Sequence, residues 1–327
     1  MDEAERENSA SAPYAGLTPD VVLDALDAVG LYGDGRLLAL NSFENRVYQV
    51  ALDGAAPVVA KFYRPGRWSD AQILEEHAFL ADLSEHEVPA VAPLVLGSGG
   101  TLATHAGYRY AVFPRQGGRV PDLENRDALE RLGCYIGRIH ALGAVRAFAE
   151  RPTLGIQSYG REPRDWLAAS DFVPAELRPA WLAAIDLALE SVARCLDAAG
   201  NVAHIRLHGD CHAGNVLWLD GPHFVDFDDA RNGPAVQDLW MLADALGEPA
   251  EAWECLLRGY RLFMDFDRRE LLLVEALRTL RLIHYAYWIA RRWSDPAFPA
   301  AFPWFGTVRY WQDRILELKE QIGAMTC

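Results

Sequence analysis

Three polar residues within the stretch 206–240 have the types and the spacing that phosphoryl transfer requires. Asp210 follows a His-Gly pair, Asn215 comes five residues later, and Asp226 lies at the end of a short apolar run. A carboxylate can accept the proton of an attacking hydroxyl, and oxygen ligands can hold the Mg²⁺ that neutralises the phosphates of ATP. The pattern therefore predicts Asp210 and Asp226 as catalytic residues, with Asn215 and Asp226 as ligands of Mg²⁺.

Each of these residues, taken singly, is more typical of an ordinary turn or a solvated loop. The combination is restrictive, because its order reproduces the protein-kinase signature of a catalytic Asp, a metal-binding Asn and a later metal-binding Asp. The letters HGDCHAGN at 208–215 and VDFDDA at 225–230 resemble the aminoglycoside phosphotransferase and choline kinase superfamily. The stretches NSFENRVYQV at 41–50 and KFYRPGRW at 61–68 resemble, more closely, bacterial stress-response Ser/Thr protein kinases.

This resemblance implies a fold and a reaction. We expect an α+β, two-lobed, protein-kinase-like fold with a small antiparallel sheet in the N-lobe and a larger, mostly helical C-lobe. The resemblance also implies ATP and Mg²⁺ as cofactors and a Ser or Thr hydroxyl, of another protein or of this one, as the acceptor. It supports a structural role for Asp238, which would hold the backbone of the catalytic loop. Asp228 and Asp229 are interpreted as solvated loop carboxylates, with indirect binding of a second metal or contact with the substrate as the alternatives.

Helical and strand periodicity shows which elements must position the nucleotide. Lys61 ends an apolar predicted strand, where a buried lysine is costly unless it is paired. In the kinase signature this lysine contacts the phosphates and pairs with a helix glutamate. Glu76 is the predicted partner because it shares the apolar stripe of the next helix with Leu80. Glu75 is the alternative.

Two more nucleotide contacts are predicted at the ends of strands. Residues 41–45 lie where a Gly-rich loop would cover the phosphates, yet they contain no glycine. Backbone N–H groups and the Ser42 hydroxyl could still donate to phosphate oxygens, and the resemblance places the nucleotide-contacting serine at Ser42. A plain polar hairpin tip is the alternative. Main-chain groups at Phe113 and Gln116 are predicted to contact adenine, because of their position at the lobe connector.

The length of the chain, 327 residues, is sufficient for two lobes that each have a core. Residues 1–115 are predicted to form the N-terminal nucleotide-binding lobe, with 1–15 as a flexible tail. Residues 116–327 are predicted to form the C-terminal catalytic and substrate lobe. Thr18 followed by Pro19 predicts the start of the first helix.

Composition limits the possible partners. The net charge of −15 argues against general nucleic-acid binding. The chain has no apolar run of the roughly 18–20 residues that cross a bilayer, and its N-terminus lacks the features of a signal peptide, so we expect no membrane partner and a cytoplasmic location. A monomer is expected. Two alternative functions stay open: a small-molecule alcohol kinase of the aminoglycoside, choline or homoserine type, and a non-catalytic nucleotide-binding scaffold. The complete set of predicted catalytic residues argues against the scaffold.

Overall fold

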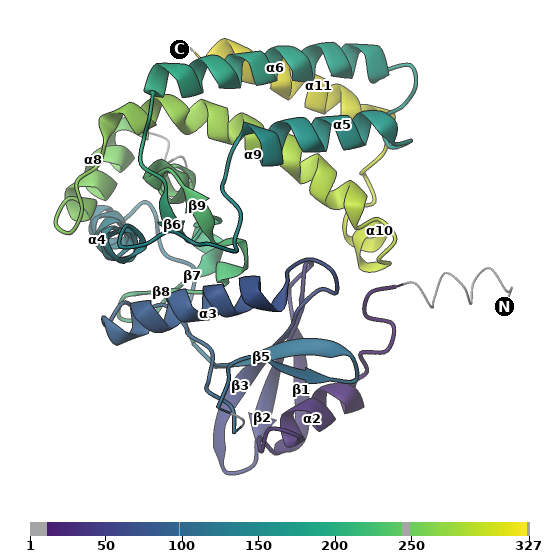
Figure 1. The fold of residues 1–327 in the computed structure, drawn as a ribbon, viewed down its shortest axis with the longest axis vertical. Helices are drawn as coiled ribbons and strands as arrows, with labels where there is room; N and C mark the ends of the chain where they lie inside the picture. Colours follow the sequence, from purple (N-terminus) through teal and green to yellow (C-terminus); the bar gives the residue numbers. More distant parts are fainter. Residues whose placement is uncertain (1–11, 98, 244–248, 326–327) are drawn as a thin grey trace, which may run out of the picture.

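The protein folds into two lobes, which confirms the predicted α+β, protein-kinase-like architecture (Figure 1). The computed structural model describes residues 12–97, 99–243 and 249–325. One lobe is built around a sheet of five strands, and the other is mostly helical. Across these described residues, every helix is too short or too polar to cross a membrane.

The N-lobe sheet carries Lys61 on a central strand. Its order is β1-β2-β3-β5-β4, and each neighbouring pair is antiparallel. The strands are β1 (Gly33–Leu40), β2 (Arg46–Leu52), β3 (Ala55–Phe62), β4 (Ala103–His105) and β5 (Tyr108–Pro114). Lys61 lies opposite Val47 of β2 and Ala111 of β5, so strands on both sides fix its backbone.

Two helices accompany this sheet, and each begins at a side chain that caps it. Helix α2 (Pro19–Asp27) starts as predicted at Thr18, whose side chain accepts a hydrogen bond from the backbone of the first turn. Helix α3 (Asp70–Glu85) starts with a reciprocal capping box between Ser69 and Gln72. Figure 1 shows α3 between the sheet and the C-lobe, where its residues can reach both.

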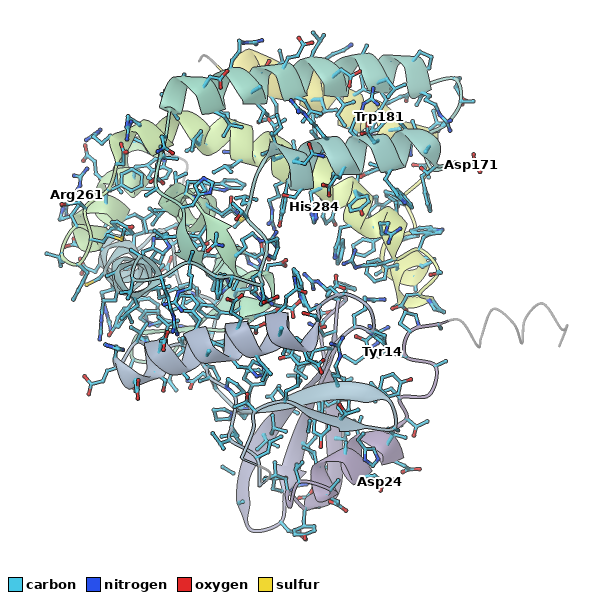
Figure 2. The ribbon with its side chains drawn as sticks, viewed as in Figure 1. Tyr14, Asp24, Asp171, Trp181, Arg261 and His284 are labelled. Carbon is cyan, nitrogen blue, oxygen red and sulfur yellow. The ribbon has the colours of Figure 1, made fainter. Side chains whose placement is uncertain are left out.

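The chain before α2 is anchored at Tyr14, labelled in Figure 2. The Tyr14 hydroxyl donates to the carbonyls of Glu44 and Phe62, both at 3.2 Å, and its ring stacks on Tyr108. Residues 1–11 of the predicted flexible tail lie outside the described residues. For Tyr14 that prediction is wrong, because this aromatic side chain finds a packed, hydrogen-bonded site on the N-lobe.

The C-lobe is held together by a close pair of helices, α4 (Arg126–Gly143) and α8 (Pro249–Tyr260). A Cβ on Gly133 would lie 2.0 Å from the Leu256 carbonyl oxygen, so only glycine permits this approach. The remaining C-lobe helices are η1 (Gln157–Arg161), α5 (Glu162–Ala169), α6 (Arg178–Ala199), α7 (Trp240–Ala243), η5 (Arg268–Leu273), α9 (Val274–Arg291), α10 (Ala297–Ala301) and α11 (Val308–Ala324). In Figure 1, α10 extends from the end of α9 toward the N-lobe.

The stretch 206–240, which carries Asp210, Asn215 and Asp226 and is called the catalytic stretch below, contains two short antiparallel pairs of strands separated by single helical turns. Strand β6 (Ile205–Leu207) pairs with β9 (Arg231–Gly233), and β7 (Val216–Trp218) pairs with β8 (Pro222–Phe224). The turns are η2 (Ala213–Asn215), η3 (Phe227–Asp229) and η4 (Ala235–Asp238). Asn215 therefore ends one turn and Asp226 directly precedes another, so both side chains sit at element boundaries beside the hairpin.

Candidate active site

The backbone of the catalytic loop is fixed by Asp238. Its carboxylate accepts hydrogen bonds from the N–H groups of His208, at 2.7 Å, and Gly209, at 2.8 Å. The buried His140 contacts the same carboxylate at 3.0 Å. These contacts confirm the predicted role of Asp238. They place Asp210 at the end of a loop that cannot shift without breaking buried bonds.

Gly209 is required by the packing of this loop. Its φ of +86° belongs to the left-handed region, and an added Cβ would meet the Asp229 carbonyl oxygen at 2.1 Å. His208 is buried, contacts the Val225 carbonyl at 2.9 Å and lies against the ring of Phe227. The loop that carries Asp210 and the loop that carries Asp226 are thus packed directly on each other.

Asp210 is bound through both carboxylate oxygens. Its Oδ1 accepts from Arg281 Nη1 of α9 at 2.5 Å, and its Oδ2 lies 3.5 Å from His212 Nε2. Burial raises the pKa of the Asp210 carboxyl, but the His212 hydrogen bond and the Arg281 charge outweigh burial and hold this pKa well below its usual range. Asp210 is therefore an ionised carboxylate that can accept a hydroxyl proton or orient the hydroxyl.

The predicted metal ligands are held close to this carboxylate. The side-chain N–H of Asn215 donates to the Asp210 carbonyl at 3.0 Å, which leaves its amide oxygen as a possible ligand. The Asn215 carbonyl accepts from the N–H of Val225, the residue before Asp226. The Asp226 side chain is 52% exposed, and its backbone adopts the left-handed conformation with φ at 60°. A residue in this uncommon conformation is typical of a functional site.

The donor set fits Mg²⁺ rather than a metal with an all-protein cage. Among the described residues there is no group of three or more His, Cys, Asp or Glu side chains that could hold a metal ion. Mg²⁺ is commonly bound by one or two protein oxygens together with waters and substrate phosphates. Asp226 and Asn215 provide oxygen atoms of that kind.

Lys61 bridges the two lobes. Its Nζ lies 3.1 Å from Asp226 Oδ1 and 3.2 Å from Asp228 Oδ1, and the side chain is almost completely buried. Burial would lower the pKa of Lys61, but the charges of Asp228 and Asp226 outweigh burial and raise this pKa well above its ordinary value. Lys61 is therefore a charged ammonium group beside the predicted metal ligand, where it could contact phosphates.

The predicted partner of Lys61 needs a correction. Glu76 is buried on the inward face of α3, as its periodicity indicates, but among the described ion pairs its partner is Arg151, at 2.9 Å. Burial raises the pKa of Glu76, while the Lys61 and Arg151 charges lower it. Glu75 accepts instead from the backbone N–H groups at 149–151, so it is not the partner of Lys61 either. Lys61 is paired with aspartates because these acids lie nearer to it than the helix glutamates do.

Arg151 connects α3 to the loop that carries Asp226. Besides Glu76, it donates to the carbonyls of Asp228 at 3.0 Å and Ala230 at 2.9 Å, and its side chain is fully buried. Nothing in the sequence around residue 151 marked it as a site residue. It supports the loop that carries the predicted metal ligand Asp226 through contacts with the backbone.

The interpretation of Asp228 as a solvated carboxylate is wrong, and Asp229, whose side chain is 32% exposed, is held in ion pairs. Asp228 is buried and paired with Lys61 and Arg67. Asp229 is paired with Arg67 at 2.8 Å and with Arg231 at 2.5 Å. Burial opposes the ionised form of Asp228, but the Arg67 and Lys61 charges lower its pKa to about 2. Two further aspartates so soon after the predicted metal ligand Asp226 could have indicated a network of ion pairs. Their partners are all cations of the same site.

The glycine-free loop 41–45 is held by both lobes through Glu44. In the N-lobe, Arg64 and Arg67 lie 3.0 Å and 3.4 Å from its carboxylate. In the C-lobe, the indole N–H of Trp288 donates to it at 2.6 Å and Arg292 pairs with it at 2.6 Å. Ser42 lies two residues before this anchor and is half-buried. Its contact with phosphate stays a prediction.

A second contact between the lobes lies beside the same loop. Asp295, just before α10, is buried and pairs with Arg46 at 3.0 Å and with Arg64 at 2.7 Å. The ring of Phe43 packs against those of Phe298 and Phe302. The loop that would cover ATP is thus docked on the C-lobe instead of being free to move.

The lobe connector follows β5 as predicted, and its backbone lies against β7. Arg119 and Trp218 exchange backbone hydrogen bonds at 3.2 Å and 2.6 Å. Phe113 is half-buried near the end of β5, and the Gln116 side chain donates to the Gly117 carbonyl. The predicted adenine contacts of Phe113 and Gln116 remain predictions.

The chain is similar to known proteins over most of its length. Residues 36–287 match the phosphotransferase enzyme family. The chain belongs to that family. Stress response kinase A of Escherichia coli (strain K12) is 45% identical over 321 residues, which cover 97% of this chain and 96% of that protein. Serine/threonine protein kinase RdoA of Salmonella typhimurium is 45% identical over 317 residues, with coverages of 96% and 95%.

Solved structures show the same fold. Amicoumacin kinase in complex with AMP-PNP and Ca²⁺ has a TM-score of 0.72 at 18% identity and covers 100% of this chain and 97% of its own. The microcompartment-associated aminopropanol kinase has a TM-score of 0.66 at 19% identity, with coverages of 92% and 95%. Membership in the phosphotransferase enzyme family confirms the family resemblance of the sequence motifs and the predicted reaction class.

Proposed function

We propose that this protein is a stress-response protein kinase that transfers the γ-phosphoryl group of ATP to Ser or Thr hydroxyls, including its own, with the help of Mg²⁺. The near-full-length likeness to proteins named stress response kinase A and Serine/threonine protein kinase RdoA supports the substrate class. The observation that carries the reaction is the convergence of Lys61, Asp210, Asn215 and Asp226 on one buried framework.

Each residue has a distinct part in this reaction. Asp210 orients the acceptor hydroxyl and receives its proton, and its low pKa keeps it ionised at neutral pH. Lys61 stabilises phosphate charge from the N-lobe side. Asn215 and Asp226 would hold Mg²⁺, which neutralises the charge of the phosphates when it is bound. Ser42 would donate to a phosphate oxygen, while Phe113 and Gln116 would line the adenine position.

The charges around Asp210 favour a protein acceptor over a polycationic small molecule. Asp210, Asp228 and Asp229 are each already paired with an arginine of this chain. An aminoglycoside would need unpaired acids at this position to gain much from its own charges, since breaking a buried ion pair is costly. A cytoplasmic location and a monomeric state stay predictions.

The test uses labelled ATP with two kinds of acceptor. The purified protein is incubated with γ-labelled ATP and Mg²⁺, once with a general protein acceptor and once with a panel of small alcohols. We expect label on phosphoserine or phosphothreonine after acid hydrolysis, and its loss when Mg²⁺ is chelated. Robust turnover of a single small alcohol without labelled Ser or Thr would instead establish the alternative, a small-molecule alcohol kinase.

A further inference from the structure

Arg281 of α9 has hydrogen-bonding capacity left beside the predicted base. Its ion pair with Asp210 uses Nη1 alone, at 2.5 Å, and 42% of the side chain is exposed. A guanidinium group has five N–H donors in a rigid planar fork. The contact with Asp210 therefore leaves other donors of Arg281 within a few ångströms of the position where an acceptor hydroxyl must bind.

Asp210 can keep this partner while it binds a substrate. Oδ1 carries the contact to Arg281, whereas Oδ2 has only the long contact of 3.5 Å to His212 Nε2. The other ring nitrogen of His212 accepts a hydrogen bond from the Gly214 N–H at 3.0 Å, which assigns the ring proton to Nε2. A serine or threonine hydroxyl can therefore approach Oδ2 without displacing Arg281.

The neighbours of Arg281 make it the cation available to a substrate. His284, one turn further along α9 and labelled in Figure 2, stacks on Tyr159 of η1 with ring centroids 4.1 Å apart. Burial lowers the pKa of His284 to about 3, so its ring is neutral. The guanidinium group of Arg231 lies over the Tyr159 ring, 4.8 Å from its centroid, but Arg231 is buried and forms an ion pair with Asp229. Of the two described arginines that contact Asp210 or the Tyr159 ring, Arg281 is the exposed one.

We propose that Arg281 selects acceptors in which the phosphorylated Ser or Thr stands next to an acidic side chain. The carboxylate of that neighbour would bind the free donors of Arg281, while the hydroxyl binds Asp210. A basic neighbour would face the same guanidinium and be repelled by it. This inference rests on the proposed protein-kinase function and adds a substrate class to it.

The chemistry sets the size of the effect. A charge-assisted hydrogen bond contributes more where it is sheltered from water and less where it is exposed. Because Arg281 is partly exposed, we expect about a tenfold preference in kcat/KM for an acidic over an uncharged neighbour, which corresponds to about 1.4 kcal/mol.

The experiment uses three peptides that differ only in the residues beside one serine, which are Glu, Gln or Lys. For the wild-type protein the expected order of kcat/KM is Glu, then Gln, then Lys. In Arg281→Gln, the kcat/KM for the Glu peptide divided by that for the Gln peptide should fall to a value of about 1–2. Arg281→Lys should keep most of the wild-type preference. Arg291→Gln is the matched control: it removes the same charge from the same helix, about 15 Å away, and should leave the ratio unchanged.

Each outcome decides the point. An equal rate with all three peptides, a preference for the Lys peptide, or an unchanged ratio in Arg281→Gln would overturn the role of Arg281. If the wild-type protein phosphorylates general protein acceptors but shows no preference, the kinase function stands and this inference fails. If no peptide or protein accepts phosphate, both fail. Thermal unfolding and nucleotide affinity of each variant show whether Arg281→Gln is still folded, and the ratio is compared only among folded variants.

Discussion

The catalytic stretch and the glycine-free loop 41–45 are held in place by two different strategies. In the catalytic stretch, the loop at 208–215 is supported from within the stretch: Asp238 binds the backbone of residues 208 and 209, and Asn215 binds the Asp210 carbonyl. The loop is supported from far away. Glu44 contacts Trp288, which lies 244 residues later, and Arg292 after it.

This difference determines how substitutions in each region should act. A self-supporting stretch carries its geometry with its sequence, so a local motif is sufficient to indicate it. The position of a loop that is held by ion pairs from another lobe depends on how the lobes dock. Fixed ion pairs take the place of the flexibility that a Gly-rich loop would have. We therefore expect changes in the catalytic stretch to affect phosphoryl transfer, and changes in the loop to affect nucleotide binding and stability together.

The largest effect is expected from Asp210→Asn. Removing the base should lower kcat by roughly 10²- to 10⁴-fold while nucleotide affinity stays nearly unchanged, because Asp210 lies at the acceptor end of the site. Steady-state kinetics and a direct ATP-binding measurement check this. Asp220→Asn is the control, since it makes the same chemical change at the exposed turn of the neighbouring hairpin. Near-normal turnover by Asp210→Asn would contradict the assignment of the base.

Glu44→Gln should come next. It removes the anion paired with Arg292 and one of the anions paired with Arg64 and Arg67, in a setting where the Glu44 side chain is only 11% exposed. Breaking a buried ion pair costs about 3–5 kcal/mol, so both the free energy of unfolding and the affinity for ATP should fall. Denaturant unfolding and the KM for ATP measure the two effects. Removing the charge of Asp34 in the surface pair Asp34–Arg36, by Asp34→Asn, should cost much less, because solvent screens an exposed ion pair. An equal loss in the free energy of unfolding for the two variants would show that Glu44 supports its loop no better than a surface ion pair would.

Glu270, one of the distant residues that support the catalytic stretch, makes stability depend on pH. Glu270 is buried and accepts the Val236 N–H at 2.8 Å. Burial raises the pKa of Glu270 to about 7, so the folded protein holds a proton that the unfolded chain has already released. This contribution is present at acidic pH and is lost as pH rises through about 7.

Between about pH 4.5 and pH 8, the wild-type protein should therefore lose about 2–3 kcal/mol of stability relative to Glu270→Gln, which cannot titrate at this site. Urea unfolding of both proteins at several pH values gives the difference. A difference that stays constant with pH would show that Glu270 keeps an ordinary pKa. The stretch would then be equally well supported in acid and in base.

The smallest effect is expected from Ser42→Ala. If the hydroxyl donates to a phosphate, its loss should weaken ATP binding by about 1–2 kcal/mol and leave the KM for the acceptor unchanged. The two constants are measured separately, with Ser84→Ala on the outer part of α3 as a serine-to-alanine control. If ATP affinity is unchanged in Ser42→Ala, loop 41–45 acts on the nucleotide through its backbone alone.

The same contrast explains what could be predicted from the sequence. Asp210, Asn215 and Asp226 lie within 17 residues, and their spacing carries the chemistry. The inward position of Glu76 followed from helical periodicity, but its partner did not. Arg151 comes from a loop 75 residues away, and no local pattern distinguishes it from other loop arginines. The buried state of Asp228 was missed because acids in a loop are normally solvated.

Helix α9 has one further consequence. Arg281 of this helix touches the predicted base, while Trp288 near its other end and Arg292, which follows its last residue, touch Glu44. Eleven helical residues span about 16 Å, and an α-helix resists compression and stretching because every turn is hydrogen-bonded. The helix therefore fixes the distance between Asp210 and the loop 41–45. An insertion of one residue between Arg281 and Trp288 would rotate one end against the other by about 100°, so the two contacts could no longer form together.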